Sequence, residues 1–335
     1  MAAGDTAMRH IILFGATLAL AASALANDTT ASSGAGGLVI QRTDAIDMVS
    51  EDLFVSADRI RIRYVFRNRT RRDVDTIVAF PMPDRDLGEE YGGDVGYPSD
   101  FRTRVAGRPI TAKLERKAMI KGKDYSALLA QLKVPIAPDS INDATKAMDR
   151  LAPADKARLV KLGLAGDEEY DSTGEGMKRH LIPLWIVKDS MWWRQRFPAG
   201  RDLVIEHNYI PGVGGSVESA IAFKQFRTTS DNRQMIKRYC IDSEFLAAVD
   251  RRSRKDQTNG PGMPDKWVDY ILTTGANWRS PIGSFRLVVD KGKPGNLVSF
   301  CETGVKKISP TQYEVRRANW RPTRDLHVLI IEPAS

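Results

Sequence analysis

The histidines are the first side chains to test for chemistry, because imidazole is both a frequent zinc ligand and a frequent general base. Beyond residue 26 the sequence contains three of them, His180, His207 and His327. A catalytic zinc ion would need all three to converge, and no two are closely spaced. His207 alternates with Leu203 and Ile205, which is typical of a strand that borders a core. We therefore expect histidines with one hydrogen bond each, and no metal site.

A serine nucleophile is the second chemistry that the sequence could supply. The Ser-Asp-Asn triplet at 230–232 matches one element of the penicillin-binding enzymes. The Ser-x-x-Lys element that carries their nucleophile is absent, and Gly-Gly-Ser at 214–216 does not continue into a G-x-S-x-G turn. No complete catalytic constellation is present. A hydrolase with an unfamiliar arrangement, involving Ser230 or His207, remains the alternative.

Two further patterns could bind calcium or phosphate. An acidic segment contains Asp84, Asp86, Glu89, Glu90 and Asp94. Glu89 stands where an EF-hand loop needs glycine, so we expect a solvated loop. The glycine clusters at 34–37 and 212–215 are not followed by the G-K-[ST] of a phosphate loop, and they are interpreted as turns. We expect no cofactor.

Two adjacent tryptophans form the best candidate binding surface. Trp192 and Trp193 are followed by Arg194 and Arg196. On a strand, neighbouring residues face opposite sides, so one tryptophan is expected in the core and the other outside. The outward tryptophan and the arginines could contact a glycan or a lipid. The alternative is that both tryptophans only pack between sheets.

The N-terminal segment has the pattern of a cleavable signal peptide. Arg9 precedes an apolar run at 11–20, and Ala24-Leu25-Ala26 offers an A-x-A cleavage site before Asn27. No later run approaches the length of a membrane-spanning helix. We therefore expect export to the periplasm of a bacterial envelope as a soluble protein, with release outside the cell as a second outcome.

The two cysteines, Cys240 and Cys301, both follow the expected cleavage site. An even number of cysteines in an exported protein indicates a disulfide. Two free buried thiols are the alternative. A redox-active pair is disfavoured because the C-x-x-C spacing is absent.

The chain is basic, with a formal net charge of +8, and arginines are dense between residues 59 and 72. Arg59, Arg61 and Arg63 alternate with isoleucines and Tyr64, which predicts a strand with one wet face. A second, more apolar strand is predicted at 74–83, and we interpret the two as a hairpin. Nucleic-acid binding is not expected, because stacking aromatics are missing and the protein is exported. An anionic envelope component or an envelope protein is the expected kind of partner.

The rest of the chain is predicted to form mainly short strands, with one block of helices among them. Leucines at helical spacing begin near residue 128, and further helices are predicted at about 140–151 and at 153–162, where Pro153 begins and Gly163 ends the last one. Short strands punctuated by glycine and proline predict a β-sandwich of the immunoglobulin-like kind. The expected domains are an N-terminal sandwich over 27–230, interrupted by a helical insertion at about 121–165, and a C-terminal β module over 231–335 that carries the cysteines.

The sequence resembles a bacterial family of exported proteins, the domain-of-unknown-function family numbered 4424. The matching segments cover essentially everything beyond the signal peptide: GGLV at 36–39, SEDLF at 50–54, VAFPMPD at 78–84, WRQRFPAGR at 193–201, GGSVES at 214–219, YCID at 239–242, TTGANWRSPIG at 273–283, LVSFC at 297–301, KISPT at 307–311 and RDLHVLI at 324–330. The resemblance implies an exported, β-rich protein and implies no activity.

These patterns together favour a non-catalytic binding or scaffolding module of the cell envelope, with a basic surface. The alternative is a hydrolase that acts on envelope material. An enzyme should bring a histidine, a carboxylate and a nucleophile together in a concave pocket. The sequence does not predict an oligomeric state.

Overall fold

The computed structural model describes residues 27–34, 37–88, 96–171, 176–253 and 262–333. The signal peptide expected over residues 1–26 lies outside these described residues. The fold is mainly β, with several sheets, a helical insertion and few other helices, so the predicted fold class is confirmed. None of the helices in the described ranges is both long and apolar enough to span a membrane.

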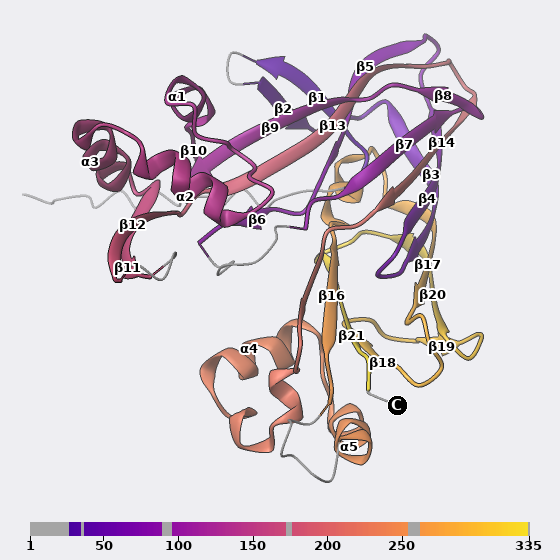
Figure 1. Ribbon diagram of the computed structural model, residues 1–335. Coiled ribbons are helices and arrows are strands. Elements are labelled where there is room, and N and C mark those ends of the chain that lie inside the picture. The colour runs from indigo at the N-terminus through magenta and orange to yellow at the C-terminus, as the bar shows by residue number, and fades with distance from the viewer. Residues whose placement is uncertain (1–26, 35–36, 89–95, 172–175, 254–261, 334–335) are drawn as a thin grey trace, which may run out of the picture.

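A large eight-stranded sheet forms one layer of a sandwich (Figure 1). Strands from both ends of the chain meet in it, because β17 pairs in parallel with β3. The sheet therefore contains strands from both sides of the domain boundary expected near residue 230. In spatial order its strands are β19 (Lys306–Lys307), β20 (Gln312–Trp320), β17 (Ile282–Asp290), β3 (Ile46–Val55), β4 (Ile60–Asn68), β14 (Asp202–Ile210), β7 (Ser99–Val105) and β8 (Arg108–Ile110).

The second layer is a sheet built around β13 and β5, which pair antiparallel over eight residues of each strand. Phe80, Trp193 and Phe197 from this sheet pack against Tyr64 and Phe66 of the large sheet, and all five side chains are buried. This shared apolar layer is the main core. The strands are β10 (Lys123–Asp124), β9 (Lys113–Ile120), β13 (Ile186–Phe197), β5 (Val74–Pro81), β1 (Thr29–Gly34) and β2 (Gly37–Gln41), with β6 (Arg85–Asp86) beside β13.

The arginine-rich strand β4 alternates as predicted. Arg61 and Arg63 are exposed, whereas Ile62 and Tyr64 are buried. The predicted hairpin with the following strand is wrong, since β4 pairs with β3 and β14 while β5 lies in the opposite sheet. The reason is that both faces of β5 are covered: Val78 and Phe80 face the main core, and Ile77 and Ala79 face a small cluster beneath β1 and β2.

A third sheet forms the centre of the C-terminal part, and it separates two cores. Val328 and Ile330 of its central strand face the main core, whereas Leu329 and Ile331 face helices α4 and α5. The predicted disulfide is present and joins Cys240, just after α4, to Cys301, just after β18. The elements are β15 (Val213–Ser216), β16 (Asp265–Tyr270), β21 (Leu326–Ile331), β18 (Leu297–Phe300), α4 (Ser230–Arg238), α5 (Ser243–Arg252), and the short 3-10 helices η1 (Ala220–Ala222), η2 (Lys224–Phe226) and η3 (Thr273–Asn277).

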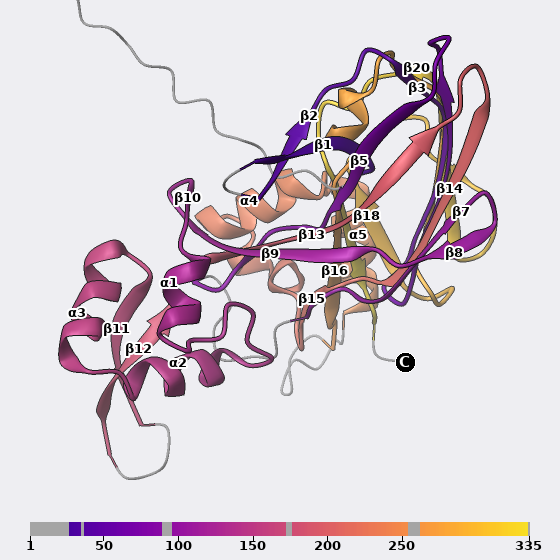
Figure 2. The same cartoon turned by 90° about the horizontal axis from the view of Figure 1, so that it is seen from above.

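The helical insertion, which in the structure runs from the end of β9 to the start of β13, projects away from the sandwich (Figure 2). It has its own apolar core around Trp185, whose indole Nε1 donates to the carbonyl of Ile136 at 2.8 Å. The last predicted helix is confirmed residue for residue, with Pro153 at its start and Gly163 in the left-handed region at φ 75°. The elements are α1 (Ser126–Gln131), α2 (Ile141–Asp149), α3 (Pro153–Leu162) and the antiparallel hairpin of β11 (Ala165–Tyr170) and β12 (Lys178–Pro183).

Candidate functional site

The three histidines lie on three different strands. His207 on β14 is buried in the main core, and its Nε2 lies 3.0 Å from the Asp28 carboxylate. His327 on β21 contacts Asp269 at 2.7 Å, and His180 lies on β12. Within the described ranges, no three histidine, cysteine, aspartate or glutamate side chains group as ligands for a metal ion.

The two residues considered for a hydrolase are not brought together. Ser230 is exposed at the start of α4, and its hydroxyl contacts the neighbouring Asp231 at 2.9 Å. Both ring nitrogens of His207 are instead engaged in the core, by Asp28 and by the hydroxyl of Thr103, each at 3.0 Å. The structure therefore forms no Ser230–His207 pair.

The acidic segment is only partly described, because Glu89, Glu90 and Asp94 fall outside the described residues. Asp84 contacts Lys188 at 2.5 Å, and Asp86 accepts a hydrogen bond from the backbone of Gly88. These two carboxylates thus serve local structure.

The two tryptophans face opposite sides of β13, as the strand geometry requires. Trp193 is 5% exposed and belongs to the main core. Trp192 is half-buried under the β1–β2 hairpin, and the ammonium of Lys113 lies 5.1 Å from the centre of its ring. Arg194 is exposed, and Arg196 forms a bidentate ion pair with Asp75 at 2.9 and 3.0 Å. A binding role for this surface stays a prediction.

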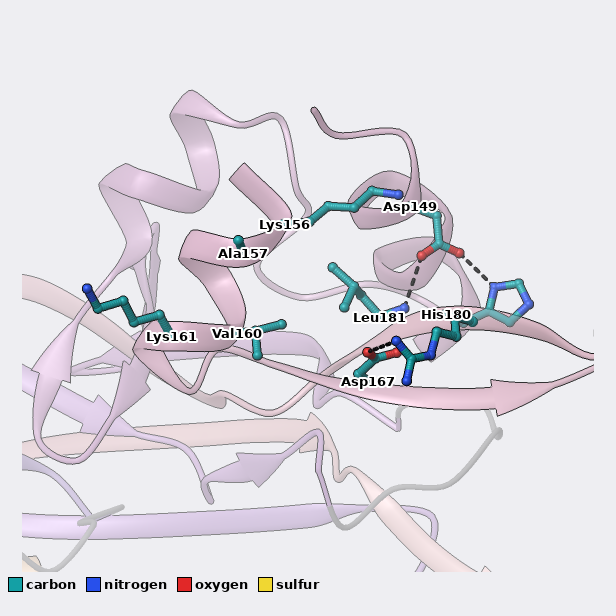
Figure 3. A pocket seen from close by; sticks show the side chains of 9 residues that line it. Asp149, Lys156, Ala157, Val160, Lys161, Asp167, His180 and Leu181 are labelled. Atoms are coloured by element: carbon teal, nitrogen blue, oxygen red, sulfur yellow. Dashed lines mark hydrogen bonds and ion pairs between the residues drawn. The ribbon is translucent and has the colours of Figure 1, made fainter. Parts of the chain in front are cut away.

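A different site is formed in the helical insertion, where a cavity of about 480 Å³ opens between α3 and the β11–β12 hairpin (Figure 3). This volume lies within the usual range for small-molecule sites. Helix α3 contributes four lining residues at helical spacing on one face, and the last residue of α2 and both strands of the hairpin contribute the others. The lining is Asp149, Lys156, Ala157, Val160, Lys161, Asp167, Arg179, His180 and Leu181.

One carboxylate links α2 to β12 at the wall of this cavity. Asp149 at the end of α2 lies 2.7 Å from Nδ1 of His180, and its other oxygen accepts the backbone N–H of Leu181 at 3.0 Å (Figure 3). The ring of Tyr170 lies against that of His180, with centres 4.4 Å apart. Because the carboxylate and the tyrosine ring both restrain it, the imidazole is held in one orientation at the cavity wall.

The charged groups around the cavity are mainly basic. Lys156, Lys161 and Arg179 line it, and the ion pair of Arg179 among the described residues is a long, exposed contact of 3.5 Å with Asp167. Such a surface pair contributes little, so the guanidinium is free to turn toward a ligand. Ala157, Val160 and Leu181 supply apolar surface. The arrangement therefore suits a small anion with an apolar part. None of the nine described residues that line the cavity is a serine, threonine or cysteine.

Sequence reasoning did not find this site. Its residues come from four separate elements, and lysines on a helix look like ordinary solvated positions. The one available signal was the face of α3, where Lys156, Ala157, Val160 and Lys161 mix basic and apolar side chains at neighbouring positions. That mixture also occurs on helices that bind nothing.

The chain resembles a family model and some distantly related solved structures. No curated protein matches it. Among solved structures, a Legionella pneumophila crystal structure described as a "putative nutrient binding protein" is 15% identical, covers 92% of this chain and 70% of its own, and gives a TM-score of 0.46. An M1 zinc metallopeptidase of Deinococcus radiodurans is 8% identical over 86% of this chain and 43% of its own, with a TM-score of 0.23. Similarities at this level do not establish a shared function. The model of the family described as Domain of unknown function (DUF4424) matches residues 26–329, and the chain belongs to that family.

Proposed function

We propose that this protein is an exported, non-catalytic binding module of the bacterial envelope, and that its cavity in the helical insertion takes a small anionic ligand. The observation that carries the proposal is the cavity itself. It combines three basic side chains and a fixed imidazole with an apolar wall. A carboxylate or phosphate group would meet the basic side chains, and the rest of the ligand would cover Val160 and Leu181.

The geometry favours binding over hydrolysis. The nine described residues that line the cavity include no serine, threonine or cysteine to act as a nucleophile beside His180 and Asp149. The signal peptide expected from the sequence supports placing the module in the periplasm, where small anions and envelope fragments are accessible. The exposed arginines of β4 add a basic surface that would favour an anionic partner.

The test is a thermal-shift and calorimetric screen of the mature protein against inorganic phosphate, citrate, hexanoate and benzoate. At a concentration of about 100 Kd, a true ligand stabilises the protein by roughly 2.7 kcal/mol, a readily measured shift. Lys156→Glu should abolish the shift. Arg158→Glu makes the same charge change on an exposed position of α3 that does not line the cavity, and it should leave binding intact. Equal effects of the two variants, or no binding of any probe, would contradict the proposal.

A further inference from the structure

The segment that begins at Asn27 is packed into the core. The side chains of Asn27 and Asp28 are both 0% exposed. The amide Nδ2 of Asn27 donates to Oε2 of Glu51 at 3.1 Å, and the indole of Trp278 donates to the carbonyl of Asp28 at 2.7 Å. These contacts hold in the core the residue that would become the first one of the chain after cleavage at the A-x-A site.

Three buried oxygen atoms in this region have no hydrogen-bond partner among the described residues. They are Oδ1 of Asn27, Oδ2 of Asp28 and Oε1 of Glu51. Oδ1 of Asn27 can only accept, and one protonated carboxyl group would supply a single O–H donor for the other two oxygens. A buried polar atom without a partner is costly and uncommon in a native core. The cluster therefore lacks a group that donates several hydrogen bonds.

The cluster also lacks positive charge. Burial raises the pKa of Glu51 to about 8, and the nearby carboxyl of Asp28 adds to this shift. Burial raises the pKa of Asp28 as well, although His207 opposes the shift. Within the described part of the chain, no lysine or arginine side chain forms a hydrogen bond with either carboxyl group. The imidazole thus serves Asp28, and Glu51 accepts a hydrogen bond from the amide of Asn27.

We propose that this cluster is the binding site for the α-ammonium group of Asn27 itself, created when the Ala26–Asn27 bond is hydrolysed. A peptidase of the export machinery would supply the reaction. Water adds across the amide bond, Ala26 leaves as a carboxylate, and the nitrogen of Asn27 leaves as an amine that takes a proton. One N–H donor then becomes three, and the site gains one positive charge.

Contacts already present hold the residue that would carry the new ammonium group. The α-nitrogen belongs to the same residue whose side-chain amide reaches Glu51, so the group would form within one residue's length of that carboxyl group. Its charge would favour the ionised form of Glu51, which has no lysine or arginine partner among the described residues. Removal of the signal peptide would therefore complete the core, and the chain would reach full stability only after export.

The first test needs no variant. The N-terminus of the protein recovered from the periplasm is sequenced, and the rate of α-amine labelling by an amine-reactive reagent at neutral pH is compared between folded and denatured protein. We expect Asn27 at the N-terminus and labelling at least roughly tenfold slower in the folded state. A different first residue, or equal labelling rates, would overturn the proposal.

The second test compares a chain that begins at Asn27 with one that begins at Ala26, which displaces the amine by one residue. The extension should lower Tm by about 5 °C or more, because it leaves buried carboxyl groups without their cation. In a Glu51→Gln background the extension should have little effect. Asp52→Asn is the matched control: it changes an exposed carboxylate on the same strand, and the extension should still lower Tm there. An equal extension effect in the wild type and in Glu51→Gln would overturn the proposal, and if Glu51→Gln does not fold, the labelling test decides.

Discussion

Asp28 and His207 lie 179 positions apart in the sequence, yet Nε2 of the imidazole and Oδ1 of the carboxylate are 3.0 Å apart, and neither side chain has any exposed surface. Thr103 contacts the other ring nitrogen, so a hydroxyl, an imidazole and a carboxylate stand in line. The same three groups form the relay of serine hydrolases, but here no substrate can reach them. Burial rather than residue type therefore decides the role of this pair, whereas the His180–Asp149 and His327–Asp269 pairs are both partly exposed.

Asp149 is expected to stabilise the helical insertion as well as to orient His180. Asp149→Ala removes the acceptor of the Leu181 N–H and the partner of the imidazole together, and we expect a loss of about 1–3 kcal/mol in the free energy of unfolding. Urea denaturation followed by far-UV circular dichroism measures it. Asp143→Ala, an exposed carboxylate in the first turn of α2, should cost no more than about 0.5 kcal/mol. Equal losses would show that Asp149 is an ordinary surface residue.

The disulfide is expected to stabilise the C-terminal part of the protein. Cys240 and Cys301 are separated by 61 positions, and they tie the end of α4 to the end of β18. Replacing both by serine should lower the free energy of unfolding by about 2–4 kcal/mol, largely through a less restricted unfolded chain. Guanidinium denaturation with and without reductant measures the change: reductant should destabilise the wild type and leave the double variant unaffected. Alkylation of either cysteine in unreduced protein would contradict the assignment.

The two neighbouring tryptophans should behave differently when truncated. Trp193→Ala leaves a cavity in the main core and should lower the free energy of unfolding by about 3–5 kcal/mol. Trp192→Ala should cost clearly less, because that ring is only half-buried.

If the outer surface binds an envelope component, Trp192→Ala and Lys113→Ala should both weaken co-sedimentation with anionic phospholipid vesicles. Arg72→Ala, an exposed arginine in the loop after β4, serves as the charge-matched control for Lys113→Ala.

Local patterns in the sequence were reliable wherever one element alone decides the outcome. The alternation around Arg61 and Arg63 predicted β4, and Pro153 with Gly163 predicted the bounds of α3. The sequence did not predict in the same way which elements pair with each other. The loop after β4 looks like a hairpin turn, but the two buried faces of β5 require it to cross to the other sheet. The cavity depends on four elements meeting, and nothing in the spacing of its residues indicates that they meet.

The pH dependence of stability provides a separate test of the buried acids. In the chain that still carries Ala26, the pKa of Glu51 is raised by burial from 4.5 to about 8, so the folded state retains a proton that the unfolded state releases in this interval. The stabilising contribution of this group is therefore complete below pH 4.5 and is lost as the pH rises toward 8.

The slope due to Glu51 should approach about 1.4 kcal/mol per pH unit within that interval. The carboxyl group of Asp28 and the phenols of Tyr64 and Tyr270, which are 2.9 Å apart, lie around it and are also buried. For this reason the informative quantity is the difference between wild type and Glu51→Gln, measured by urea denaturation from pH 4.5 to 8.5. Wild type should lose stability relative to the variant as the pH rises. In a chain cut before Asn27, the new ammonium group favours ionised Glu51, so the difference in slope should shrink. An unchanged slope after cleavage would mean that the amine does not reach the acid.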